Sequence, residues 1–545
     1  MTMANYWIMP VAFCLVLVAC ERKSPAYHPE TPAENLQIAE TVDYQPDRDL
    51  EELFVRVQME KLYPDSKTFV DATPLFPPAD ILADYRRSAG EESFDMAAFV
   101  ASHFRLPDPL PAINVDVSRP LREHLQHHWD ALVREASADE RSSTLIPLPQ
   151  PYVVPGGRFR EMFYWDSYFT LVGLMASGRD TLAKQMIDNF AYLIDRYGYI
   201  PNGNRTYFLG RSQPPFFAAS LQLYANKHGM ESVIGYLPLL EREYRFWMDG
   251  QSGELDAGKE GKHLVTLANG DFLNRYYGSR SEPRAEAYNK EYLWAEQYQV
   301  QDKAQFFRDL RAACESGWDF SSRWFADGQS KASINTHEII PVDLSSLMYS
   351  MEITLARMYE HRQDQAKSAF YRTRAVRRQQ LIEQYHFDPV TGTYQDYNYV
   401  AASHTGQLSL AMLFPLFFGV AGPDNALGVV KVLEQQFLKP GGLVTSLRQS
   451  GEQWDYPNGW APLQYVAVEG LAHYGYDTLA RDIARRWLAL NERVYREEGK
   501  MMEKYNVVDT HVKAGGGNYP NQDGFGWTNG VALAFYEFLD SPIAH

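Results

Sequence analysis

A helical pattern of apolar residues, which recurs from about residue 155 to the end, constrains the fold of this chain more than any other feature. In one stretch the apolar residues follow the i, i+3, i+4, i+7 spacing of a buried helix face: Leu344, Leu347, Met348, Met351, Leu355 and Met358. Asp343 stands directly before this stretch and is predicted to be the helix N-cap. Alternation typical of strands is scarce, so the pattern predicts an all-α class of fold whose function lies on its loops.

The charge of the chain excludes one large class of function. The net charge is −17 over 545 residues, whereas nucleic acids bind to strongly basic surfaces. We therefore expect no nucleic-acid partner. Aromatic residues make up 14% of the chain and include 35 Tyr, which is common where sugars stack on rings and also in helical cores.

The first 20 residues are typical of a signal peptide. The apolar stretch from Trp7 to Ala19 has the length of a signal-peptide core rather than of a membrane span. The residues from Leu17 to Cys20 resemble a bacterial lipobox, in which the cysteine is lipidated after cleavage; a plain secretory signal that is cut nearby is the alternative. We expect the mature protein in the periplasm, with a lipid on Cys20 as a possible anchor to the outer membrane.

The rest of the chain is predicted to have one main domain. Residues 21–44 are polar and rich in proline, which is typical of a tether. The domain then spans 45–545, with 45–148 as a helical N-terminal extension packed on it. If Cys14 is removed and Cys20 is lipidated, Cys314 has no partner, so no disulfide is expected. We expect a monomer.

Six regions combine aromatic rings with charged and amide side chains. The first, "PGGRFREMFYWDSY", holds five rings and four charges within fourteen residues. This mixture suits a carbohydrate, because sugar rings present apolar faces to aromatic side chains and hydroxyls to polar ones. The regions are Pro155–Tyr168, Pro201–Pro215, Glu282–Tyr288, Glu315–Trp324, Gln453–Gln464, and Glu503–Asn506 with Ala514–Gly530.

Motifs for other chemistries are missing from the sequence. It contains no HExxH or CxxC, no phosphate-binding GxxxxGK[ST] loop and no GxSxG nucleophile turn. We therefore predict neither a metal nor a cofactor. Carboxylates remain as candidate catalytic groups, and hydrolysis of a glycosidic bond needs two of them.

Two of these regions resemble the signatures of a known family, the trehalases: "PGGRFREMFYWDSY" and "QWDYPNGWAPLQ". The resemblance runs from about Lys61 to Leu539 and includes "SGWDFSSRW" and "YPNQDGFGWTNGV". It implies an (α/α)6 barrel that hydrolyses the disaccharide α,α-trehalose to two glucose molecules with inversion and without a cofactor. It also implies Asp319 as the general acid and Glu503 as the general base.

The resemblance further implies a set of substrate-binding residues. Trp454 would be a sugar-contacting ring, and Asn518 stands where the family has a glutamate that contacts substrate. The complete set is Arg158, Trp165, Asp166, Asn202, Arg211, Ser212, Gln213, Arg284, Glu286, Gly317, Trp454 and Asn518.

Other interpretations of these residues stay open at the level of sequence. Asp319 would ordinarily be a turn former beside glycine and serine, and a glutamate in a charged stretch such as that of Glu503 is ordinarily solvated. Trp460 and Trp527 each open an apolar helix, which is typical of core indoles. The alternative functions are another inverting glycosidase on the same barrel, or a trehalose-binding lipoprotein with weak catalysis.

Overall fold

The computed structural model describes residues 44–107, 116–136, 143–249, 261–267, 269–516 and 519–542. All of these residues belong to one unit of the chain, Gln37–His545. The predicted signal peptide, the lipidation site at Cys20, the tether up to residue 43 and the binding residue Asn518 lie outside the described residues.

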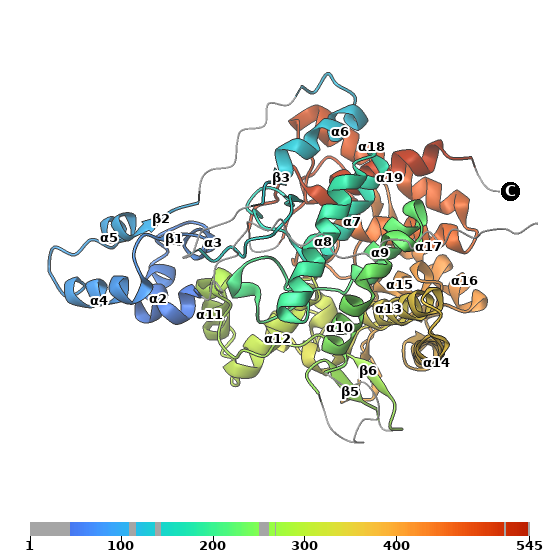
Figure 1. Cartoon of the computed structure of the whole chain (residues 1–545), viewed down its shortest axis with the longest axis horizontal. Helices are drawn as coiled ribbons and strands as arrows, with labels where there is room; N and C mark the ends of the chain where they lie inside the picture. Colours follow the sequence, from blue (N-terminus) through green and yellow to red (C-terminus); the bar gives the residue numbers. More distant parts are fainter. Residues whose placement is uncertain are drawn as a thin grey trace, which may run out of the picture. The chain divides into compact units, whose positions relative to one another are not determined.

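In the part of the chain that is described, six helices form a closed inner ring, because each contacts the next and the last returns to the first (Figure 1). In order around the ring they are α7 (Tyr164–Ala176), α9 (Phe217–His228), α13 (Val342–His361), α15 (Phe414–Phe417), α17 (Ala461–His473) and α19 (Gly526–Asp540).

Helices of an outer set alternate with the inner ones along the chain. They pack on the ring from outside: α8 contacts α7 and α9, α10 and α14 contact α13, α18 contacts α17 and α19, and α6 contacts α19. The outer set is α6 (Leu121–Leu132), α8 (Asp180–Tyr197), α10 (Leu237–Trp247), α14 (Gln365–Tyr385), α16 (Pro423–Val432) and α18 (Asp477–Glu498). This alternation is an (α/α)6 barrel, so the predicted fold class is confirmed.

Inner and outer helices differ in sequence because they are buried to different extents. The inner helix α7 is buried without a break from Tyr164 to Leu174, and its sequence is correspondingly apolar all round. The outer helix α18 instead buries one face, with residues such as Ile483 and Trp487, and exposes charged residues on the other. The helical stripes predicted from the sequence are therefore core residues of the barrel.

Two glycines allow the closest contact in the ring, between α7 and α19. A Cβ on Gly173 would lie 2.2 Å from the Cα of Gly530, and a Cβ on Gly530 would lie 2.1 Å from the carbonyl oxygen of Phe169. Both distances are far below van der Waals contact, so only glycine lets the two helix backbones approach this closely.

One predicted helix start was wrong. Helix α13 begins at Val342 after Pro341, so Asp343 lies inside the first turn and is not its N-cap. The Asp343 carboxylate instead accepts a hydrogen bond of 2.8 Å from the buried Arg323 guanidinium, which also pairs with Asp396. The demand for a partner to a buried cation outweighs the local capping preference.

The strands are short, and some pairs, such as β14 with β15, join segments that are separated by two helices in the sequence. Six antiparallel pairs are described: β1 (Thr73–Pro74) with β2 (Phe104–Arg105), β3 (Val133–Arg134) with β4 (Tyr152–Val153), β5 (Leu264–Thr266) with β6 (Phe272–Asn274), β8 (Phe387–Asp388) with β9 (Thr393–Tyr394), β12 (Leu438–Lys439) with β13 (Gly442–Leu443), and β14 (Asn458–Trp460) with β15 (Lys504–Asn506). A three-stranded sheet has the order β11 (Ser403–His404), β10 (Tyr397–Asn398), β7 (Ile339–Ile340).

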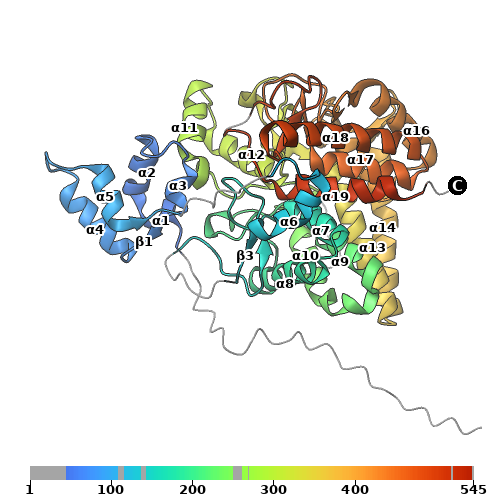
Figure 2. The ribbon, with the colours of Figure 1, turned by 90° about the horizontal axis from the view of Figure 1, so that it is seen from above.

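The N-terminal helices have a small core of their own that reaches the barrel loops. They are α1 (Pro46–Asp49), α2 (Glu51–Met59), α3 (Lys67–Val70), α4 (Pro78–Ser88) and α5 (Met96–His103). Their apolar cluster includes Phe163 and Phe208, which precede α7 and α9. Helix α2 also contacts α11 (Tyr288–Gln297) (Figure 2). In the sequence, α11 and α12 (Lys303–Glu315) stand between the outer helix α10 and the inner helix α13. The extension boundary at residue 148 stays a prediction, although α6, which precedes it, packs on α19 as an outer helix.

The connections that lead from an outer helix into the next inner helix hold the polar aromatic regions of the sequence. In sequence order the six regions each precede or begin an inner helix: 155–168, 201–215, 282–288, 315–324, 453–464, and 503–506 with 514–530. The barrel thus gathers segments that are far apart in the sequence. Among the described residues, no helix has the length and apolar character needed to span a membrane.

Candidate active site

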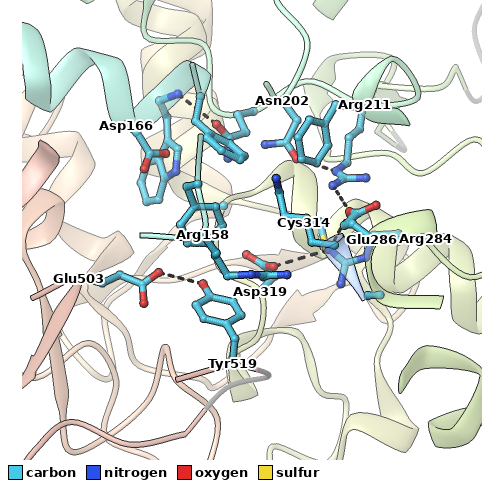
Figure 3. Close-up of a pocket in the computed structure, with 18 of the residues that line it drawn as sticks. Arg158, Asp166, Asn202, Arg211, Arg284, Glu286, Cys314, Asp319, Glu503 and Tyr519 are labelled. Atoms are coloured by element: carbon cyan, nitrogen blue, oxygen red, sulfur yellow. Dashed lines mark hydrogen bonds and ion pairs between the residues drawn. The ribbon is translucent and has the colours of Figure 1, made fainter. Parts of the chain in front are cut away.

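One cavity gathers most of the predicted site residues (Figure 3). It is lined by Arg158, Trp165, Asp166, Asn202, Arg211, Gln213, Arg284, Glu286, Gly317, Asp319, Trp454 and Glu503. Ser212 is not among the lining residues: its hydroxyl donates to the carbonyl of Ile200 at 2.7 Å and its N–H to Glu315 at 2.9 Å. Asn518 lies outside the described residues, so its binding role stays a prediction.

Asp319 lies in the loop that follows α12. The preceding Gly317 has φ +77°, and a Cβ there would lie 2.7 Å from the Trp165 indole, so the turn that carries Asp319 requires glycine. The Asp319 side chain keeps 33% of its surface exposed, and its nearest cation is Arg284 at 3.7 Å. Burial raises the pKa of Asp319 to about 6, although Arg284 and Arg211 oppose the shift.

Glu503 lines the same cavity and lies directly before β15. Its side chain is only 2% exposed. One carboxylate oxygen accepts a hydrogen bond of 2.8 Å from the Tyr519 hydroxyl, and the other accepts one of 3.0 Å from Lys504 Nζ. Its backbone carbonyl accepts from the Trp527 indole at 3.0 Å. Both carboxylate oxygens therefore accept hydrogen bonds from buried or partly buried donors.

Arginine–carboxylate pairs form the other wall of the cavity (Figure 3). Arg211 donates to Glu286 at 2.7 Å and to Asn202 at 2.8 Å, and Arg284 binds Glu291. Although burial opposes the shift, Arg211 and Arg284 lower the pKa of Glu286 to about 2, so this carboxylate is ionised. Arg211 Nη1 and Glu286 Oε2 are buried without a hydrogen-bond partner in the described structure, so a donor and an acceptor remain for a polar ligand.

Indole rings line the cavity on a third side. Trp454 stacks on Trp460 with ring centroids 3.8 Å apart and an interplanar angle of 1°, and Trp527 packs edge-on against Trp460 at 5.6 Å. Trp165 lies 5.6 Å from Trp454. The sequence interpretation of Trp460 and Trp527 as core indoles was incomplete, because both are buried and both also line the cavity.

A further carboxyl group, that of Asp166, lines the cavity with Asp319 and Glu503. Asp166 lies in the first turn of α7 and is almost fully buried. Burial, with the added repulsion of Glu503 and Asp319, raises the pKa of Asp166 well above its usual range. Three neighbouring carboxyls with different environments can thus differ in protonation at the same pH, which is the requirement for one acid and one base in a single site.

Sequence reasoning missed several lining residues, chiefly Ser66, Lys67, Phe159 and Tyr519. Ser66 and Lys67 come from the N-terminal helices, where "KLYPDSKTF" carried a family resemblance but no predicted role. Asp65 in the same motif holds Arg158 through two hydrogen bonds of 2.6 and 2.8 Å. Tyr519 opens the quoted motif "YPNQDGFGWTNGV", but nothing in the sequence pairs it with Glu503.

The arrangement suits hydrolysis of a glycosidic bond. Asp319 and Glu503 come from different loops and have different environments, and the cavity between them is lined by rings and by hydrogen-bonding groups. Among the described residues no group of three or more His, Cys, Asp or Glu side chains is arranged to hold a metal ion.

Comparison with known proteins decides the family. The trehalase family model matches residues 61–540 of this chain. The chain belongs to the trehalase family. It is 45% identical over 525 residues to the periplasmic trehalase of Pseudomonas aeruginosa, which covers 96% of each chain. It is also 45% identical to the periplasmic trehalase of Escherichia coli, over 91% of this chain and 87% of that protein. Like other trehalases, the protein is a glycoside hydrolase.

Solved structures support the same assignment. The neutral trehalase of Saccharomyces cerevisiae superposes with a TM-score of 0.58 and 27% identity, covering 77% of this chain and 80% of that one. The mannosylglycerate hydrolase of Thermus thermophilus has a TM-score of 0.51 at 18% identity, over 77% of this chain and 100% of that one. The second similarity shows that the barrel is shared, and no more.

Proposed function

We propose that this protein hydrolyses α,α-trehalose to two glucose molecules with inversion, with Asp319 as general acid and Glu503 as general base. The observation that carries the proposal is the contrast between the two carboxyls in one ring-lined cavity. Asp319 is partly open and has a raised pKa, whereas Glu503 is buried and held by Tyr519 and Lys504. The names of the relatives, periplasmic trehalases at 45% identity, support the substrate.

Asp319 gives its proton to the glycosidic oxygen as the bond breaks. Its pKa of about 6 keeps a large fraction protonated in mildly acidic solution. When a disaccharide fills the cavity and displaces water, the exposed third of the Asp319 side chain also becomes buried, which favours the neutral acid further.

Glu503 takes a proton from the water that attacks the anomeric carbon. The Tyr519 hydroxyl donates to one of its oxygens at 2.8 Å and fixes the orientation of the carboxylate. Burial and the neighbouring Glu503 raise the pKa of Tyr519 well above its usual value, so the phenol remains a donor. An inverting enzyme places this water on the face of the sugar opposite the acid.

The remaining lining residues bind the two glucose units. Arg158, Arg211, Arg284, Asn202 and Gln213 offer donors to hydroxyls, and Glu286 offers acceptors. The rings of Trp165 and Trp454 present apolar faces to the sugar. Asp166, Gly317, Ser212 and Asn518 complete the proposed set, Ser212 acting through the backbone it anchors. No cofactor takes part.

The test is proton NMR of α,α-trehalose mixed with protein that lacks residues 1–20. Inversion produces α- and β-glucose in equal amounts before mutarotation. Asp319→Asn should release glucose about 10²–10⁴-fold more slowly, and Asp195→Asn, which changes a carboxylate that is 75% exposed on α8, should match the wild type. α-Glucose alone from the wild type would contradict the inverting mechanism. If the wild type releases no glucose, trehalose hydrolysis is refuted, and the remaining functions are trehalose binding or hydrolysis of another glycoside.

We propose further that the protein works as a periplasmic monomer, with residues 1–20 removed as a signal peptide and residues 21–44 serving as a tether from a lipid on Cys20. The periplasmic names of the relatives support the compartment. Mass spectrometry of protein purified from membrane and soluble fractions tests the anchor: a lipid mass on Cys20 supports it, and a lipid-free N-terminus beyond Cys20 contradicts it. Size-exclusion chromatography with light scattering tests the monomer.

A further inference from the structure

We propose that Lys504 and Gln453 form a buried bridge that keeps Glu503 ionised and ties it to the loop of Asp319. The two residues would be positioning residues, since neither lines the cavity. This inference rests on the proposed function, because it assigns a task only if Asp319 and Glu503 are the acid and the base.

The hydrogen-bond partners of the Lys504 ammonium in the described structure are Glu503 and Gln453. Its side chain is 1% exposed, and its Nζ donates to Glu503 Oε2 at 3.0 Å and to Gln453 Oε1 at 3.2 Å. The ammonium also lies over the rings of Trp460 at 5.1 Å and Tyr519 at 5.5 Å. A lysine buried this deeply is costly unless its charge is paired, and the Glu503 carboxylate at 3.0 Å supplies that pairing.

Gln453 connects this cation to the other catalytic loop. Its amide nitrogen donates to the carbonyl oxygen of Asp319 at 2.6 Å. Its own carbonyl accepts from the Trp460 indole at 3.0 Å and from the Asn458 amide at 3.1 Å, which holds the Gln453 backbone in place. The chain of contacts from Glu503 through Lys504 and Gln453 therefore reaches the backbone of Asp319.

Electrostatics explains what the bridge supplies. Glu503 is 2% exposed, and burial favours the neutral form of a carboxyl unless a cation lies beside it. Asp166 from α7 and Asp319 from the loop after α12 face the same carboxylate, but neither can supply a positive charge to it. Tyr519 donates a neutral hydrogen bond, whereas Lys504 supplies a full positive charge in contact with the carboxylate. The nearby arginines Arg158, Arg211 and Arg284 are engaged by Asp65, Glu286 and Glu291. Without Lys504, Glu503 would be a buried carboxylate with no cation in contact, and uptake of a proton would relieve that cost and abolish the base.

The test is the pH dependence of kcat/KM on trehalose for Lys504→Met, Lys504→Arg, Gln453→Leu and the wild type. An opposite charge within about 4–6 Å shifts a carboxyl titration by about 1–3 pH units. The acidic limb of Lys504→Met should therefore move up by about 1–3 pH units while the alkaline limb stays in place. Lys504→Arg keeps the charge and should keep the wild-type acidic limb. Gln453→Leu should lower kcat without moving the acidic limb.

The matched control is Lys331→Met, which removes another buried lysine from a neighbouring loop. Lys331 pairs with Glu452 at 3.0 Å and lies over the Trp294 ring, but it does not line the cavity. Its loss should lower the melting temperature and leave both limbs unchanged. If Lys504→Met does not fold, Lys504→Arg and Gln453→Leu still test the proposal. An acidic limb that moves in Lys504→Arg would overturn the bridge. An unchanged kcat in Gln453→Leu would overturn it as well.

Glu503→Gln separates failure of this inference from failure of the proposed function. Loss of turnover in Glu503→Gln together with an unmoved acidic limb in Lys504→Met refutes the role of Lys504 alone. Full turnover in Glu503→Gln refutes the proposed base, whatever Lys504→Met does. A shifted limb in Lys504→Met with loss of turnover in Glu503→Gln supports both.

Discussion

The two carboxyl-bearing sides of the cavity are built differently. The Asp319 side is open to the cavity, and an arginine lies 3.7 Å from the carboxylate. The Glu503 side is closed, and hydroxyl and ammonium groups donate directly to both oxygens. Two carboxyl side chains of one cavity thus stand in different environments, one open beside a cation and the other buried under two donors. In the proposed mechanism the environment of each carboxyl, and not its type, selects the acid and the base.

Removal of either carboxyl should have the largest effect on kcat, because it takes away the proposed acid or the proposed base. General acid or base catalysis contributes about 10²–10⁴-fold, so Asp319→Asn and Glu503→Gln should each lose about that much kcat on trehalose. A glucosyl fluoride has a leaving group that needs no proton, so it should restore turnover to Asp319→Asn and not to Glu503→Gln. Rescue of both variants, or of neither, would contradict the assignment of acid and base.

Arg284→Met should have the next largest effect. The substitution removes a charged donor that is proposed to bind a sugar hydroxyl, so kcat/KM should fall by about 10- to 100-fold. Because Arg284 opposes the rise in the pKa of Asp319, its loss should raise that pKa further and move the alkaline limb to higher pH. Arg284→Lys should return the limb toward the wild-type position. An alkaline limb that moves to lower pH would contradict the electrostatic account of the acid side.

The pH profile of the wild type should reveal the acid directly. The pKa of Asp319 is about 6, and the acid form is the active one, so rising pH converts it to an inactive carboxylate. The alkaline limb of kcat/KM should therefore bend near pH 6 and then fall about tenfold per pH unit. The measurement is initial glucose release across buffers from pH 4 to 9, with the protein shown to be folded at each. Constant kcat/KM up to pH 8 would rule out Asp319 as the acid.

The smallest effect is expected from the N-terminal helices. Asp65→Asn loses the charge that holds Arg158 in place, so KM for trehalose should rise about threefold to tenfold while kcat changes little. Asp84→Asn, in the same part of the chain and facing Arg87, is the control and should leave both constants unchanged. An equal fall in kcat for Asp65→Asn would mean that Arg158 acts in the transition state as well as in binding.

Much of the fold could be predicted because helix type is a local property. The stripe from Leu344 to Met358 lies within α13, and a glycine, Gly229, ends α9. Asp343 shows where local reasoning fails. The residues beside Asp343 in the sequence predicted an N-cap. Its carboxylate instead accepts a hydrogen bond from Arg323, which lies twenty positions earlier.

The candidate site shows the same difference between what is local in the sequence and what is not. Cavity-lining positions such as Arg158, Asp319 and Glu503 could be listed from motifs, because the polar aromatic regions are contiguous in sequence. Their partners could not: Asp65 is 93 positions from Arg158, and Gln453 is 134 positions from Asp319. The roles of all these residues stay proposals until the variants are measured.

The helical fold class and membership of the trehalase family could be predicted from the sequence, which also supplied two candidate carboxyls. That Asp319 keeps a third of its surface open beside Arg284, and that Glu503 is buried against Lys504 and Tyr519, is visible only in three dimensions. The physical reason is that apolar periodicity acts over a few residues, whereas desolvation and Coulomb energy depend on distances in space that are set when distant loops meet above the barrel.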